Sequence, residues 1–168
     1  MRRFSLRHLG RGRAAMLAAA IWGGIAGQAL AADLVPWGNV VRDMDNRIDW
    51  LRCAVGQRWN GDTCLGEALR LNHDAMPQVI AQANQQLGGR WRLPTRRELE
   101  GLLCQTCRPA RIDPRLFPAT PATSFWTGQR PLLSPRNYWS VNFLIGHSYG
   151  RFFPQHELAV RLVRDRRD

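Results

Sequence analysis

The chain contains no lysine, so all 24 of its basic residues are arginine. It also has no Gly-x-Ser-x-Gly nucleophile elbow, no His-Glu-x-x-His zinc motif and no phosphate-binding glycine loop. Beyond the N-terminal segment the histidines are His73, His147 and His156, and none stands at a metal-ligand spacing from another histidine or a cysteine. These absences leave no sequence motif for hydrolysis, nucleotide binding or a metal centre. We therefore predict no catalytic residue, no metal and no cofactor.

The one long apolar run of the chain is shorter than the about 20 residues that a transmembrane helix needs. Residues 1–31 carry five arginines and no acid, followed by this apolar run over residues 14–26 and a small-x-small site before Ala32. That order is typical of a secretory signal peptide. We expect cleavage after Ala31, with export to the periplasm, the cell surface or the medium, and no transmembrane segment in what remains.

Residues 32–168 have the length of one domain, with a core expected over about residues 40–164. This part carries 19 arginines against 13 acidic residues, a net charge of +6. Guanidinium groups bind phosphate, sulfate and carboxylate in a bidentate manner, which favours a polyanionic partner. A bias toward arginine on a solvated exterior explains the charge equally well. We do not expect a nucleic-acid partner.

The four cysteines should form disulfides in an oxidising compartment. Four cysteines allow three connectivities, and the simplest joins Cys53 to Cys64 and Cys104 to Cys107. The Cys-x-x-Cys spacing of the second pair also suggests thiol exchange. Reactive pairs of this type use a helix N-terminus, however, whereas Cys104 lies at the far end of the helix that we predict to start at Thr95.

The most informative stretch is the motif formed by Trp91, Arg92, Leu93, Pro94, Thr95, Glu98 and Leu99. Pro94 favours extended backbone at Leu93 and cannot join the interior of a helix. Thr95 and Glu98 have the spacing of a capping box, in which each side chain binds the backbone N–H of the other. The motif therefore predicts a strand end, a corner and a capped helix.

Other segments predict a mixed α+β fold. A short strand is expected around Ile48 and Trp50, a disulfide-closed loop over residues 53–64, and a helix over residues 71–87, capped by Asp74 and ended by Gly88. A proline-rich irregular connection over residues 109–121 leads to a strand over residues 125–127. A strand follows over residues 138–145, with one face formed by Trp139, Val141, Phe143 and Ile145. After it come a turn over residues 146–150 and a last alternating strand over residues 158–162. The last strand should pair with the first.

Taken together, these pieces resemble one bacterial family of unknown function. They are Arg52-Cys53, Gly56-Gln57, Trp59-Asn60-Gly61, Thr63-Cys64, Trp91-Arg92-Leu93-Pro94-Thr95, Glu98-Leu99, Phe125-Trp126-Thr127 and Tyr138-Trp139-Ser140-Val141-Asn142-Phe143. In this order they are similar to the Lcl C-terminal domain family, named for a collagen-like surface adhesin. The resemblance implies a C-type-lectin-like fold, with two helices packed on a small twisted antiparallel sheet whose end strands meet. That adhesin is credited with binding sulfated glycosaminoglycans, but this chain has no collagen-like repeat.

The predicted function is an exported, non-catalytic binding domain for an anionic glycan or an envelope protein. The candidate ligand-binding residues surround the predicted turn: Arg130, Arg136, His147, Tyr149 and Arg151. Calcium is not predicted, because the chain lacks the Glu-Pro-Asn and Gln-Pro-Asp triplets of calcium-dependent lectins. Scattered surface charge explains these arginines as well.

Two alternatives belong to other classes. The stretch from Arg92 to Glu98 is also similar to formylglycine-generating enzymes, but those place their paired reactive cysteines near the C-terminus, and no cysteine follows Cys107 here. An enzyme of that kind or a thiol-redox protein would need free, low-pKa thiols. A structural accessory subunit is the third possibility.

Overall fold

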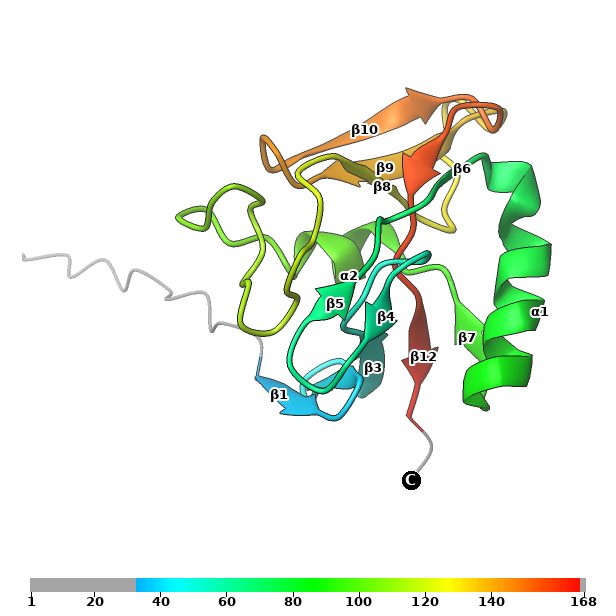
Figure 1. The fold of residues 1–168 in the computed structure, drawn as a ribbon. Helices are drawn as coiled ribbons and strands as arrows, with labels where there is room; N and C mark the ends of the chain where they lie inside the picture. Colours follow the sequence, from blue (N-terminus) through cyan, green and yellow to red (C-terminus); the bar gives the residue numbers. More distant parts are fainter. Residues whose placement is uncertain (1–32, 167–168) are drawn as a thin grey trace, which may run out of the picture. The chain divides into compact units, whose positions relative to one another are not determined.

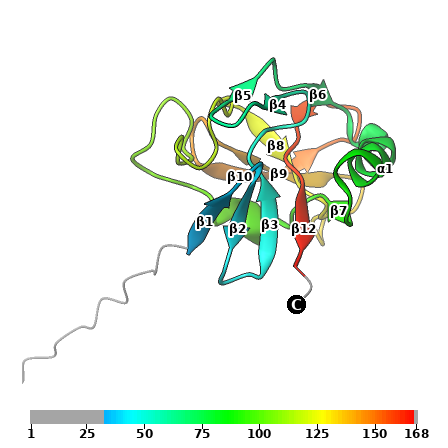
Figure 2. The same cartoon turned by 60° about the horizontal axis from the view of Figure 1, so that its bottom comes forward.

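The computed structural model describes residues 33–166 and shows two five-stranded sheets with few helices. The predicted leader lies outside the described residues. The first sheet has the order β1-β2-β3-β12-β7, with β1 at Leu34–Trp37, β2 at Val40–Asp43, β3 at Ile48–Leu51, β12 at Val163–Asp165 and β7 at Trp91–Arg92. The strand predicted around Ile48 and Trp50 is β3, and β1 and β2, which precede it, were not predicted. Figure 2 shows β1, β2, β3 and β12 side by side.

The second sheet has the order β10-β9-β8-β11-β6. Its strands are β10 at His147–Phe152, β9 at Tyr138–Asn142, β8 at Ser124–Trp126, β11 at Leu158–Ala159 and β6 at Arg70–Leu71. All its pairs are antiparallel except β8 with β11. A separate pair joins β4, Arg58–Trp59, to β5, Cys64–Leu65. The α+β class is confirmed, but the expected single antiparallel sheet is wrong.

The C-terminal segment, residues 158–165, connects the two sheets. It leaves the second sheet after β11 and enters the first as β12, between β3 and β7 (Figure 1). Val163 lies opposite Trp50, so the last strand pairs with the Ile48–Trp50 strand, but this strand is β12 and not the predicted strand over residues 158–162. Leu158 and Ala159 of the predicted strand instead form β11 in the second sheet. The predicted alternation of buried and exposed side chains is wrong. All residues from Leu158 to Val163 are buried, because side chains of this segment pack into both clusters of the core.

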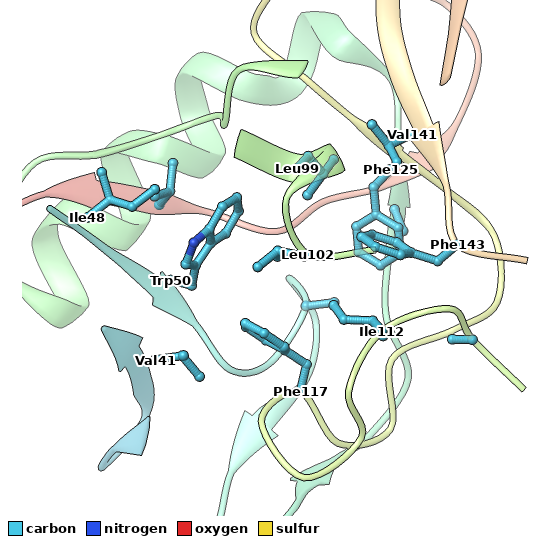
Figure 3. Packing of buried hydrophobic residues seen from close by; sticks show 14 residues of the cluster. Val41, Ile48, Trp50, Leu99, Leu102, Ile112, Phe117, Phe125, Val141 and Phe143 are labelled. Atoms are coloured by element: carbon cyan, nitrogen blue, oxygen red, sulfur yellow. The ribbon is translucent and has the colours of Figure 1, made fainter. Parts of the chain in front are cut away.

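Two clusters of buried side chains form the core. The first contains four aromatic side chains from separate segments of the chain: Trp50, Phe117, Phe125 and Phe143 (Figure 3). The second holds Met76, Trp91 and Trp126 together with Leu158, Val160 and Leu162. Fully burying one such side chain contributes about 1.5–3 kcal/mol, so this packing is the main stabilising term.

The longer helix, α1 at Met76–Leu87, follows a single 3-10 turn at His73–Ala75. The backbone N–H of Ala75 donates to the Asn72 side chain at 3.0 Å. Asn72 rather than Asp74 is therefore the cap of this segment, which corrects the prediction. Pro77 is tolerated in the first turn, and Gly88 ends the helix at a positive φ of 66°, as expected.

The second helix, α2 at Arg96–Glu100, has the predicted capping box. The Glu98 N–H donates to Thr95 Oγ1 at 3.2 Å, and the Thr95 N–H donates to Glu98 Oε2 at 2.7 Å. Arg92 adds two hydrogen bonds to the same carboxylate, at 2.8 and 2.9 Å. The helix has only five residues, because the chain turns away after Gly101.

The hairpin of β9 and β10 differs from its prediction. Strand β9 ends at Asn142, whose side chain accepts from the Leu144 N–H at 2.8 Å and so starts the turn there. The turn therefore precedes His147. Of the predicted turn residues, Gly146 lies in the observed turn, and residues 147–150 lie in β10. Val141 and Phe143 are buried as predicted, but Ile145 is exposed.

Both predicted disulfides are present, Cys53–Cys64 and Cys104–Cys107. Among residues 33–166, no helix has the length and apolar character to cross a bilayer.

Candidate functional site

A groove of about 730 Å³ runs along α1. Its floor is apolar and includes Leu51, Val55, Leu69, Val79, Ala83 and Leu162. One wall is α1, and the other is the disulfide-closed loop at Arg58 and Trp59. A concave, mainly apolar site with a few polar groups at its edge is the usual form of a ligand pocket.

Three glutamines form the α1 rim of this groove. Gln78, Gln82 and Gln86 are spaced by four residues, so they follow one side of the helix, and all three are exposed. Each amide offers two N–H donors and one carbonyl acceptor. The rim can therefore both donate and accept hydrogen bonds over more than two helical turns.

Trp59 supplies the aromatic surface of the opposite wall. The Arg52 guanidinium lies 4.0 Å from the centroid of the Trp59 ring. Arg52 is itself fixed, because it donates to the backbone carbonyls of Leu116 at 2.9 Å and Arg115 at 2.7 Å. Arg52 is thus a positioning residue that holds the indole in place.

The loop beside Trp59 is closed tightly. The Asn60 side chain accepts from the N–H groups of Asp62 and Thr63, and Gly61 has a φ of 106°. Gly56 has a φ of 94°, and a Cβ there would lie 2.6 Å from the Leu69 side chain. Turn chemistry and close packing therefore fix this wall of the groove.

The residues predicted from the sequence lie elsewhere, on the second sheet. His147, Tyr149 and Arg151 alternate on the exposed side of β10, an edge strand. Arg130 and Arg136 lie in the connection between β8 and β9. Pro131 of this connection packs against Gly150, where an added Cβ would lie 2.9 Å from its Cγ. The connection and Arg151 therefore meet at one end of the hairpin, whereas His147 lies opposite Asn142 at the other end.

An aromatic cluster lies behind Arg130 and was not predicted. The Arg130 guanidinium lies 4.2 Å from the Tyr138 ring centroid, and the His73 ring stacks on Tyr138 at 3.4 Å. The His73 Nε2 atom is 3.1 Å from the Thr127 carbonyl oxygen. Burial lowers the pKa of His73, and the nearby positive charge of Arg130 acts in the same direction. No spacing in the sequence links these three residues.

Arg161 is a second feature that was not predicted from the sequence. Its side chain is fully buried and donates to the carbonyls of Leu51 and Arg52 and to Thr120 Oγ1. Burial lowers the pKa of Arg161 to about 9. This arginine joins the end of β3, the C-terminal segment and the proline-rich connection, and it faces no ligand surface.

All four cysteine sulfurs are engaged in disulfides. Cys104 follows the end of α2 and so does not lie at a helix N-terminus. Within residues 33–166, no three side chains of the His, Cys, Asp and Glu types are grouped so that they could hold a metal ion.

Comparison with known families gives one result. A family model described as the Lcl C-terminal domain matches residues 39–164. No curated protein and no solved structure matches the chain. The match covers both helices, the groove and every strand of the two sheets except β1 and the last residue of β12. The chain belongs to the Lcl C-terminal domain family.

Proposed function

We propose that this protein is an exported, non-catalytic binding domain whose α1 groove holds an anionic glycan. The observation that carries the proposal is the pairing of Trp59 with the row of Gln78, Gln82 and Gln86 across an apolar floor. A sugar ring has an apolar face that packs on an indole and hydroxyls that bind side-chain amides. The groove offers both kinds of contact at once.

The charge of the groove favours an anionic ligand. Among the described residues, Arg58 is the one charged side chain of the lining, and no carboxylate belongs to it. Arginine pairs with sulfate and carboxylate groups through two parallel hydrogen bonds. Arg136 and Arg151 lie on another surface, and in this proposal they raise the rate of encounter with a polyanion rather than hold it.

The fold is proposed to be C-type-lectin-like. The pairing of β12 with β3 brings the N- and C-terminal parts of the described chain together, as expected for that fold. The presence of two helices beside antiparallel strands also supports the relationship.

The test is a titration of the protein with sulfated, carboxylated and neutral oligosaccharides over a salt series. Trp59→Ala should weaken binding at least about tenfold, because a central tryptophan commonly dominates an interface. Gln82→Ala should weaken it by a smaller factor. The matched control is Trp37→Ala, since Trp37 is 60% exposed on β1 and lies outside the groove.

Three results would contradict this proposal. They are unchanged affinity in Trp59→Ala, an equal loss in Trp37→Ala, and no binding of any oligosaccharide. The last result would favour an accessory subunit or a protein ligand. An enzyme of the thiol-redox or formylglycine-generating type would instead show reactive thiols at Cys104 and Cys107 in the native protein, which alkylation and mass spectrometry detect.

A further inference from the structure

We propose that residues 130–136 form a membrane-contact loop, which inserts Leu132 and Leu133 into the interface of an anionic phospholipid bilayer. The loop lies outside the α1 groove, so this inference does not depend on the ligand proposed above.

The first observation is the exposure of the loop tip. Leu132 and Leu133 are both 95% exposed, the highest values among the large apolar side chains that the structure leaves at the surface. Two adjacent leucines in water on a well-packed domain indicate a surface made to contact something apolar. Phe153, 52% exposed, follows β10 at the same end of the hairpin, because Phe152 lies opposite Tyr138.

The second observation is that the loop holds a defined shape. The Ser134 N–H donates to the Pro131 carbonyl at 3.3 Å, which closes a turn around the two leucines. The Asn137 N–H donates to the Ser134 carbonyl at 3.0 Å, and Arg130 donates to the Pro135 carbonyl at 2.5 Å. Pro131 rests on Gly150. A turn that already has its bound shape loses little conformational entropy on insertion.

The third observation is charge. Arg130 and Arg136 flank the leucines, and Arg151 lies on β10 beside the glycine that contacts the loop. The sequence contains no Asp or Glu between Asp113 and Glu157. An apolar tip between arginines is the pattern of interfacial membrane elements, in which side chains enter the bilayer surface while cations meet lipid phosphates.

These observations favour a lipid surface over a soluble polyanion. A soluble polyanion would engage the arginines and leave both leucines in water. A bilayer offers acyl chains to the leucines and phosphates to the arginines at the same time, because these groups lie within one side-chain length of each other.

The test is partition onto lipid vesicles. The exported protein is purified after processing and mixed with vesicles of phosphatidylglycerol and phosphatidylcholine, or of phosphatidylcholine alone, and bound protein is measured by sedimentation. Leu132→Asp with Leu133→Asp should lower the partition coefficient at least about tenfold. Arg136→Gln and Arg151→Gln should each lower it about fivefold on the anionic vesicles.

The matched control is Leu144→Asp with Ile145→Asp. These two residues are 54% and 40% exposed and lie in the turn at the opposite end of the hairpin. The control should partition like the wild type. A Leu133→Trp variant should also gain fluorescence quenching by brominated lipid relative to the wild type.

The proposal is overturned if the wild type does not bind anionic vesicles. It is also overturned if the Leu132 and Leu133 changes leave binding intact while the arginine changes abolish it, since that result shows contact through charge alone. An equal loss in the Leu144 and Ile145 control would assign the membrane contact to another surface. Trp59→Ala should leave vesicle binding unchanged, so failure here and failure of glycan binding are separate results.

Discussion

Arg161 shows how one residue can join three segments. Its guanidinium lies among buried rings, 4.8 Å from the Phe117 centroid, and carries hydrogen bonds to two backbone carbonyls and a threonine hydroxyl. Because burial lowers its pKa only to about 9, the group stays charged at neutral pH. A buried charge without enough partners costs several kcal/mol, so the three acceptors are needed to keep Arg161 inside.

Replacing Arg161 should therefore be severe. Arg161→Met keeps much of the volume but leaves the carbonyl oxygens of Leu51 and Arg52 without a donor, and we expect a loss of about 3 kcal/mol in the free energy of unfolding. Arg161→Ala adds a cavity and should cost more. Urea denaturation measures both, with Arg136→Ala as an exposed control. A Met variant as stable as the wild type would show that water or backbone movement satisfies these carbonyls.

At the scale of elements, the start of α2 is held by a network of charge. Glu98 accepts from Thr95 and Arg92, and Arg92 also pairs with Asp165 of β12. Burial alone would raise the pKa of Glu98, but the hydrogen bonds from Arg92 and Thr95 outweigh it and lower the pKa. The helix cap, β7 and β12 are thus joined through one guanidinium, that of Arg92.

This network gives stability a pH dependence of known sign. A carboxyl whose pKa is lowered by folding stabilises fully above its unfolded value of about 4.3, and the contribution is lost as pH falls through the folded pKa. Glu98→Gln should therefore lower the free energy of unfolding by about 1–2 kcal/mol at pH 7. The difference from the wild type should shrink toward zero in acid. Chemical denaturation from pH 3 to 7 tests this, with exposed Glu67→Gln as control; a difference independent of pH would contradict it.

The sequence predicted the ends of helices better than it predicted the pairing of distant strands, because helix ends depend on local signals. The capping box at Thr95 and the helix end at Gly88 depend on neighbouring residues, and both are present. The turn was predicted over residues 146–150 but lies over residues 143–146, because the Asn142 side chain starts it. The alternation of apolar residues does not reveal this local competition. The division into two sheets depends on pairings between distant segments, which no local pattern encodes.

The candidate site was less predictable than the fold. The sequence indicated the β10 residues because arginine, tyrosine and histidine gather near a predicted turn. The groove is formed by Trp59 and α1, which are brought together only by tertiary packing. The spacing of Gln78, Gln82 and Gln86 was the one sequence signal that could have pointed to it.

At the scale of the whole molecule, the two sheets depend on one segment. Strand β12 lies between β3 and β7, and β7 has β12 as its only partner in the sheet order of the described residues. Strand β11, directly before it, pairs with β8 and β6 in the other sheet. Loss of the C-terminal segment would open both sheets and both cores.

A truncation tests this dependence. Removing residues 160–168 should abolish the cooperative thermal transition and the near-ultraviolet circular dichroism signal, since Val160, Leu162 and Val163 are all buried core residues. Removing residues 167–168 alone serves as the control and should leave both signals unchanged. A cooperative melt in the longer truncation would show that one sheet folds without the other.

The position of β12 also governs when folding can finish during synthesis. The strands that it joins appear early in the chain, at Ile48–Leu51 and Trp91–Arg92, but they meet only when residues 163–165 have emerged. A chain that grows from its N-terminus therefore has β3 and β7 unjoined until β12 has been made. The two disulfides, by contrast, join cysteines only 11 and 3 residues apart, so neither pairing depends on β12. When β12 closes the first sheet, all residues of the second sheet and of both disulfides are therefore already present.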